Sequence, residues 1–138
     1  MIELGDAALS HALSINEKDE ANIVCFNMSA NLCDCWNDAF KRERRHFERG
    51  LAYADRALEF RRQLGKTPDK VAMAHWARGK HLLSLGRFSD AISAFKENYD
   101  CVVAANNADE PETLEASKAY LGIARQAARE SNGKVQYE

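Results

Sequence analysis

The 138-residue sequence predicts an all-α fold of about six antiparallel helices. Only two prolines and seven glycines occur, and residues that favour helices (Ala, Leu, Arg, Glu and Lys) are plentiful. Apolar residues recur at helical spacing along most of the chain, and each series ends at a short polar or glycine-containing stretch. A chain of this length can bury enough apolar surface to fold without a disulfide or a metal.

The first half of the chain predicts three helices. The first covers about residues 3–15, and the second runs from about residue 20 to residue 40. A basic stretch, KRERRHFER, leads to a third helix over about residues 47–64. Their apolar series are Leu4, Ala8, Leu9, Ala12, Leu13 and Ile15; Ile23, Phe26, Ala30, Cys33, Trp36 and Phe40; and Leu51, Ala54, Ala57, Leu58 and Phe60.

Glycine and proline mark the helix boundaries in the second half. Gly65 suits the end of the third helix, and Pro68 suits the start of a fourth over about residues 69–85. Gly86 leaves only a short turn before a fifth helix over about residues 88–104, so we expect these two helices to form an antiparallel pair. Pro111 precedes a sixth helix at about residues 112–130. We expect one domain over residues 1–130 and a frayed tail over residues 131–138.

Gly79 lies inside the fourth helix, where glycine costs about 1 kcal/mol relative to alanine. Glycine at this position indicates that another backbone comes close. Ala91, one turn into the fifth helix, is the expected contact. Phe88 and Phe95 are expected to fill the space around it.

The order and spacing of Gly79, Gly86, Phe88, Ala91 and Phe95 resemble the signature of a tetratricopeptide repeat, a 34-residue helix-turn-helix unit. Other segments carry weaker likeness. Leu121-Gly122 resembles the Leu-Gly pair of a further repeat, 43 residues after Gly79. That length is similar to the extended repeats of kinesin light chains and of peptide-sensing bacterial regulators. Ala57-Leu58 resembles the Ala-Leu pair of a second repeat helix, and Ala30 stands at the small crossing position of the helix before it.

The resemblance implies a right-handed superhelix of the tetratricopeptide type, in which two full repeats are flanked by half-repeats. The chain would open with a second helix and close with a first helix. In this family the first helices line a concave face that binds extended peptides. In this sequence, that register implies the inward-facing residues Asn27, Asn31, Asp34, Met73, Trp76, Lys80, Ala119 and Ile123. We therefore expect a protein–protein interaction module, a scaffold or peptide-binding adaptor, without enzymatic activity.

The expected roles of these residues follow from their chemistry. Asn27 and Asn31 lie one helical turn apart, and an asparagine amide can both donate to and accept from a peptide backbone. Trp76 is either an anchor for an apolar side chain or a part of the core. Lys80 could meet a carboxylate, although a lone lysine is usually only solvated. The carboxylate clamp of chaperone-binding relatives is not expected, because Met73 and two alanines stand where it needs polar side chains.

Charge and cysteine patterns argue against several other classes of function. The formal net charge is −2, without the basic excess that is typical of nucleic-acid binding. We expect no signal peptide and no membrane span, since the chain lacks a suitable apolar segment. Cys33 and Cys35 do not form a CxxC motif, and no histidine spacing completes a zinc site. We expect a cytoplasmic protein with reduced cysteines, no cofactor, no metal and no nucleic-acid partner.

Two alternatives remain open at this point. One is a self-associating structural module with an unoccupied groove. The other is a regulator that binds RNA through the basic stretch from Lys41 to Arg45. We also expect either a homodimer through the terminal helices or a fragment of a longer array, because the apolar residues of the first and sixth helices extend beyond one stripe.

Overall fold

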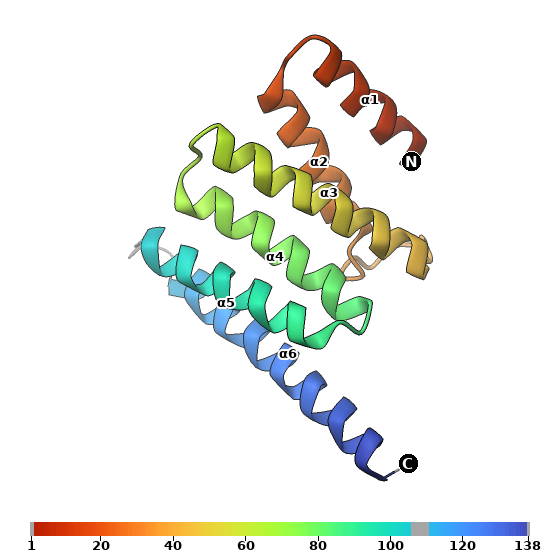
Figure 1. Ribbon diagram of the computed structural model, residues 1–138, viewed down its shortest axis with the longest axis vertical. Helices are drawn as coiled ribbons and strands as arrows, with labels where there is room; N and C mark the ends of the chain where they lie inside the picture. The colour runs from red at the N-terminus through yellow and green to blue at the C-terminus, as the bar shows by residue number, and fades with distance from the viewer. Residues whose placement is uncertain (1, 106–110, 138) are drawn as a thin grey trace.

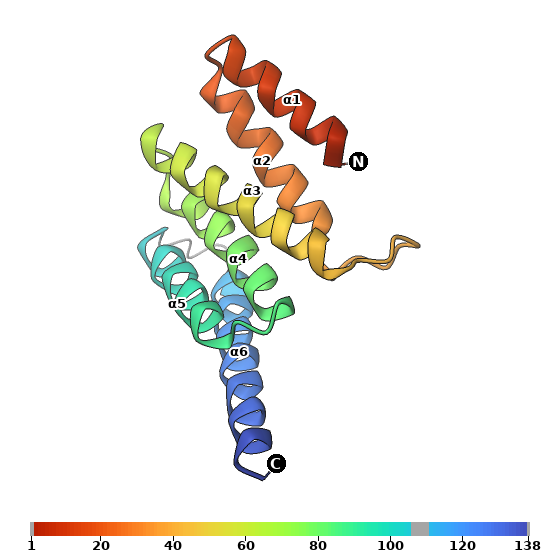
Figure 2. The same cartoon turned by 45° about the vertical axis from the view of Figure 1, so that its right-hand side comes forward.

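The computed structural model describes residues 2–105 and 111–137, and these residues form six α-helices (Figure 1). The prediction of an all-α fold with about six helices is confirmed. Successive helices run antiparallel in a row, and each packs mainly on its neighbours in the chain (Figures 1 and 2). The helices are α1 (Ile2–Ser14), α2 (Lys18–Leu32), α3 (Arg44–Gln63), α4 (Pro68–Ser84), α5 (Phe88–Ala105) and α6 (Pro111–Tyr137).

The predicted extent of the second helix is wrong. α2 ends at Leu32, because Cys33 is extended, with φ −65° and ψ 151°, and residues 33–43 contain no helix. Asp and Asn occur at positions 34, 37 and 38, and their side chains compete with the helical backbone for hydrogen bonds. Trp36 and Phe40 were expected in the core, but both lie exposed on the segment that projects beyond the helices (Figure 2).

Two further helix ends differ from the expected ones. α3 begins at Arg44 because Glu43 and His46 form a capping box. The Glu43 N–H donates to His46 Nδ1 at 2.8 Å, and the Glu43 side chain accepts from the His46 N–H. α6 continues to Tyr137, through the segment where the sequence predicts a frayed tail. Residue 138 lies outside the described part of the chain.

The close approach of α4 and α5 is confirmed, and Phe95, expected to fill the space around it, is the side chain nearest to Gly79. The atoms nearest to Gly79 belong to Phe95, whose ring would lie 2.6 Å from a Cβ at position 79. Phe95 and Ala91 are both fully buried. Gly86 has φ 76°, in the region that glycine adopts without strain, and forms the turn between the two helices.

A buried histidine joins three helices. His81 Nε2 on α4 lies 2.9 Å from the Ser29 carbonyl oxygen on α2. The His81 ring lies so close to Gly50 on α3 that a Cβ there would not fit. The Ser29 hydroxyl also donates to the Gly50 carbonyl oxygen at 2.8 Å. Because a carbonyl only accepts, Nε2 carries the ring hydrogen, and burial lowers the pKa of His81.

Two polar side chains make the same kind of bridge in successive helix pairs. Arg61 on α3 donates from Nε to Asn22 on α2 at 2.8 Å and from Nη1 to the Lys70 carbonyl oxygen on α4 at 2.6 Å. Asn98 on α5 donates to the Ala72 carbonyl oxygen on α4 at 2.8 Å and accepts from Ser117 on α6 at 2.6 Å. Each bridge links a helix to the helices before and after it, so the two pairs share one packing scheme.

Gly79 generates the first prediction. Replacing Gly79 with Ala should destabilise the protein by about 1–3 kcal/mol, because the Phe95 ring is buried and has little room to move. Gly122 is the matched control, since no atom lies within 4 Å of a Cβ built there. Gly122→Ala should stabilise α6 by up to about 1 kcal/mol through helix propensity alone. Urea unfolding of both variants measures the effect, and equal shifts would contradict the close contact.

His75 generates a second prediction. Its side chain is 2% exposed, neither ring nitrogen has a partner among the described residues, and burial lowers its pKa to about 4. The folded state therefore holds a neutral ring, while the unfolded chain takes up a proton below its ordinary pKa of about 6.5. The contribution of neutral His75 to the free energy of unfolding should be complete above about pH 6.5. As the pH falls from there to about pH 4, the free energy of unfolding should decrease by on the order of 3 kcal/mol.

The variant His75→Phe separates this effect from general acid denaturation. It removes two unpaired ring nitrogens, so it should raise the free energy of unfolding near neutral pH by about 1–3 kcal/mol. It should also flatten the decline below about pH 6.5. Urea unfolding at about pH 7 and about pH 5 measures both effects. A variant that keeps the full pH dependence of the parent would show that another group is responsible.

Candidate binding face

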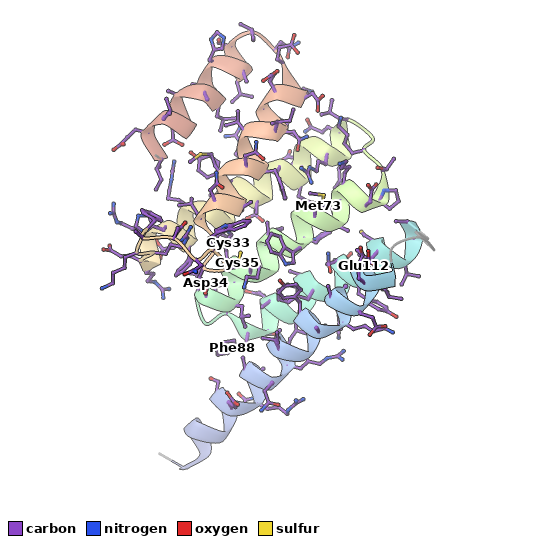
Figure 3. The ribbon with its side chains drawn as sticks, turned by 180° about the vertical axis from the view of Figure 1, so that it is seen from behind. Cys33, Asp34, Cys35, Met73, Phe88 and Glu112 are labelled. Atoms are coloured by element: carbon purple, nitrogen blue, oxygen red, sulfur yellow. The ribbon has the colours of Figure 1, made fainter. Side chains whose placement is uncertain are left out.

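Three alternate helices form one continuous face of the molecule. α2 contacts α4 directly, and Trp76 and Lys80 of α4 both meet Tyr120 of α6. Asp34 and Met73, labelled in Figure 3, are seen from the side on which α6 passes in front of α5. We call this surface the α2–α4–α6 face; it comprises Ile23, Asn27, Asn31, Asp34, Met73, Trp76, Lys80, Ala116, Ala119 and Ile123.

The charged residues of this face are paired with one another. Lys80 Nζ lies 3.3 Å from Asp34 Oδ1, and 86% of the Lys80 side chain is buried (relative exposure 14%). Ser84 Oγ donates to Asp34 Oδ2 at 3.2 Å. Lys80 Nζ also lies 5.7 Å from the centre of the Tyr120 ring, within the range of a cation–π interaction. Lys80 is therefore held by the protein itself, and the expected contact with a ligand carboxylate would have to displace Asp34.

Trp76 has features of both roles that the sequence allows, a part of the core and an exposed anchor. Its ring meets Tyr120 edge to face, with centroids 6.1 Å apart, and Tyr120 in turn stacks on Phe95 at 5.6 Å. Trp76 packs against the buried cluster of α4, α5 and α6 but remains partly exposed. It therefore supports α6 and also presents part of its ring on the face.

Asn27 and Asn31 are exposed one turn apart on α2. Within the described residues neither side-chain amide makes a hydrogen bond, while the Asn31 carbonyl oxygen accepts from Arg42 Nη2 at 2.6 Å. Both amides therefore keep their full capacity to donate to and accept from a bound backbone.

Large apolar side chains are exposed on all three helices of the face. Ile23 on α2 is 46% exposed, Met73 on α4 is 39% exposed and Ile123 on α6 is 52% exposed. Ile23 was expected in the core, and the sequence reasoning missed it as a site residue. Helical spacing offered a signal, because Ile23 lies four positions before Asn27 and so one turn away on the same side of α2.

The segment from Cys33 to Glu43 borders the face at the end of α2. Arg42 organises it, with Asp38 at 2.9 Å and the Phe40 ring 5.0 Å from the guanidinium carbon. Trp36 Nε1 donates to the Ala30 carbonyl oxygen at 2.7 Å. A hollow of about 440 Å³ lies among these side chains, Asn31 and Asn37. The sequence reasoning missed Trp36, Phe40 and Arg42 because it placed this segment in a helix or in a solvated basic stretch.

The basic stretch from Lys41 to Arg45 is locally neutralised. Arg42 pairs with Asp38, Arg44 pairs with Glu48 at 3.1 Å, and Arg45 pairs with Glu43 at 3.3 Å. Lys41 has no acidic partner among the described residues. A surface that binds nucleic acid needs cations that are free to meet phosphates, and this stretch offers few.

The cysteines are free thiols. Burial raises the pKa of Cys25 to about 11 and that of Cys33 to about 12, so both keep their proton near neutral pH. In the described part of the chain no three His, Cys, Asp or Glu side chains gather as metal ligands.

Each described helix is too short or too polar to cross a membrane. Comparison with protein-family models, with curated proteins and with solved structures gives no match. The relation to tetratricopeptide repeats thus stays a prediction from the sequence.

Trp76 generates the third prediction. Trp76→Ala should lower the free energy of unfolding by about 2 kcal/mol, less than for a fully buried tryptophan, because only part of the ring is buried. Asn27→Ala, on the same face but without contacts to lose, should leave the free energy of unfolding within about 0.5 kcal/mol of the parent value. Urea unfolding measures both. An unchanged stability in Trp76→Ala would show that the ring does not support α6.

Proposed function

We propose that this protein is a binding module that holds an extended segment of a partner protein on the α2–α4–α6 face. We also propose that its helices form a superhelix of the tetratricopeptide type, in which this face is concave. The observation that carries the proposal is the exposure of Ile23, Met73 and Ile123 on three helices of one face. Exposed apolar side chains that line up across several elements usually mark an interaction surface.

The charges and polar groups of the face define the kind of segment that fits. The Asp34–Lys80 pair cancels its own charge, so the face favours neither an acidic nor a basic segment. The free amides of Asn27 and Asn31 can hold a peptide backbone whatever its side chains. The segment is therefore expected to have spaced aliphatic or aromatic side chains, with its backbone bound near α2.

RNA binding is the less favoured alternative. It would rest on residues 41–45, where ion pairs with Asp38, Glu43 and Glu48 already occupy the arginines. No arrangement of a nucleophile, a base and a carboxylate supports catalysis on the α2–α4–α6 face, so we propose a protein that binds and does not catalyse.

The fourth prediction tests the face with peptides selected from a random displayed library. Met73→Asp places a charge among the exposed apolar side chains, and the double variant Asn27→Ala, Asn31→Ala removes the free amides. Each should weaken binding of the selected peptides at least about tenfold, which corresponds to about 1.4 kcal/mol. Fluorescence titration measures the affinities, and circular dichroism checks that helicity is retained.

Leu64→Asp is the matched control, because Leu64 is exposed at the end of α3, outside the face. It should bind the same peptides as tightly as the parent protein. Peptides that bind all three variants alike, or that lose affinity only with Leu64→Asp, would place the binding surface elsewhere and contradict the proposal.

A further inference from the structure

The first and last helices of the row, α1 and α6, each lack a packing partner on one side, and the two free sides differ. On α4, Gly79 is covered by Phe95 of the helix that follows. Gly122 stands at the matching position of α6, 43 residues later, and no atom lies within 4 Å of a Cβ built there. In the described residues, α6 thus has the position of a first helix in a pair, without a second helix packed on it.

α1 lacks the other member of a helix pair, the first helix. Gly5 of α1 lies against Met28 of α2, as Gly50 of α3 lies against His81 of α4. The two glycines are 45 residues apart, so α1 has the same relation to α2 that α3 has to α4. α1 is therefore a second helix of a pair, and no described residue supplies its first helix.

The sequence spacing also identifies the side chain on α1 that matches Phe95. Leu58 precedes Phe95 by 37 positions, the spacing that also relates the bridging residues Arg61 and Asn98. Leu13 precedes Leu58 by 45 positions, the spacing of the two glycines. Leu13 is 41% exposed, and Leu4 on the same helix is 77% exposed. α1 thus carries a large apolar side chain at the position that covers the glycine in the α4–α5 pair.

We infer that α1 of one copy of this chain packs on α6 of a second copy, with Leu13 over Gly122 as Phe95 lies over Gly79. The contact completes a helix pair between two molecules. It uses the ends of the row and goes beyond the peptide binding proposed for the α2–α4–α6 face.

The charges of α1 and α6 favour a contact between these two helices in different copies of the chain. Antiparallel pairing places the start of α1 beside the second half of α6. The start of α1 has Glu3 and Asp6 but no Lys or Arg. The Asp6 carboxylate already accepts from Arg49 and Tyr53 of its own chain, so Glu3 is the free carboxylate at this end among the described residues. On α6, Arg125 and Arg129 have no carboxylate partner among the described residues. Arg125 also lines a hollow of about 420 Å³ between α5 and α6, together with Lys96, Lys118 and Asp100.

A symmetric dimer through α1 alone or through α6 alone would not place Leu13 over Gly122. A contact between different surfaces does not close on itself at two copies, so the expected assemblies are head-to-tail chains whose length grows with concentration.

Two variants block one end each. Leu13→Asp places a charge on α1 where an apolar side chain is needed, and Gly122→Leu fills the open space on α6. Both positions are exposed, so both variants should fold with helicity like that of the parent. A single helix pair is a small interface and binds weakly, so light scattering should extend to about 100 μM. The parent mass should rise above 15.5 kDa with concentration, and each variant alone should stay monomeric.

Mixing the two variants gives the decisive measurement. Leu13→Asp keeps an intact α6, and Gly122→Leu keeps an intact α1, so an equal mixture should form a complex of twice 15.5 kDa and no longer chain. A symmetric dimer through either helix would instead survive in one variant alone. The double variant Arg125→Glu, Arg129→Glu should also weaken assembly, while Lys41→Glu, at an exposed position outside both ends, should not.

Added salt should weaken the assembly, because the two ends attract through exposed charges. A parent protein that stays at monomer mass over the whole range overturns the inference. So does association of both single variants at the parent's level, or a mixture that stays monomeric. Peptide binding to the α2–α4–α6 face remains measurable in Leu13→Asp, so failure of this inference and failure of the proposed function can be told apart.

Discussion

The junction of His81, Gly50 and Ser29 is the contact on which the arrangement of the helices depends. His81 has no exposed surface, its Nε2 is bonded to α2, and its ring occupies the space that the missing Cβ of Gly50 leaves on α3. The junction therefore sets the spacing of α2, α3 and α4 at one point. The Asp34–Lys80 ion pair joins the segment just after α2 to α4, so it links these two elements again at the surface, on the α2–α4–α6 face.

The rest of the row repeats this packing with other side chains. Gly5 with Met28 and Gly79 with Phe95 are further contacts in which a glycine makes room for a long side chain on the next helix. Arg61 and Asn98 bridge successive pairs in the same way. Because each helix packs mainly on its neighbours in the chain, the structure has the nearest-neighbour character of repeat proteins, in which the ends lack contacts that the middle has.

The proposed binding face and the proposed end contact are compatible with each other. In a head-to-tail chain, α6 of one molecule would be followed by α1 and then α2 of the next. α6 and the next α2 would then be successive first helices, so the α2–α4–α6 face would continue from one molecule to the next. A chain of this kind would offer repeated sites to a long or multivalent partner, whose overall affinity would exceed that of one site.

The sequence by itself determined the helices wherever apolar spacing, glycine and proline agree. It predicted the all-α class, the antiparallel α4–α5 pair and the turn at Gly86, where the structure has a φ of 76°. These features depend on local backbone preference and helical periodicity. The sequence also predicted that Asn27, Asn31, Met73 and Lys80 lie on helices, and they lie on α2 and α4, whereas Asp34 lies just beyond the end of α2.

Only the tertiary structure decided which side chains satisfy one another. The end of α2 depends on Trp36 and Arg42, which fold back on carbonyl groups of the last helical turn; apolar spacing continues through this segment and gives no sign of it. The sequence did not show that the Phe95 ring lies nearest to Gly79, because the direction of a side chain across a helix pair depends on the crossing geometry. Lys80 is engaged by Asp34, 46 residues away. Contacts between such distant residues leave no periodic trace in the sequence, since they depend on how the helices are packed.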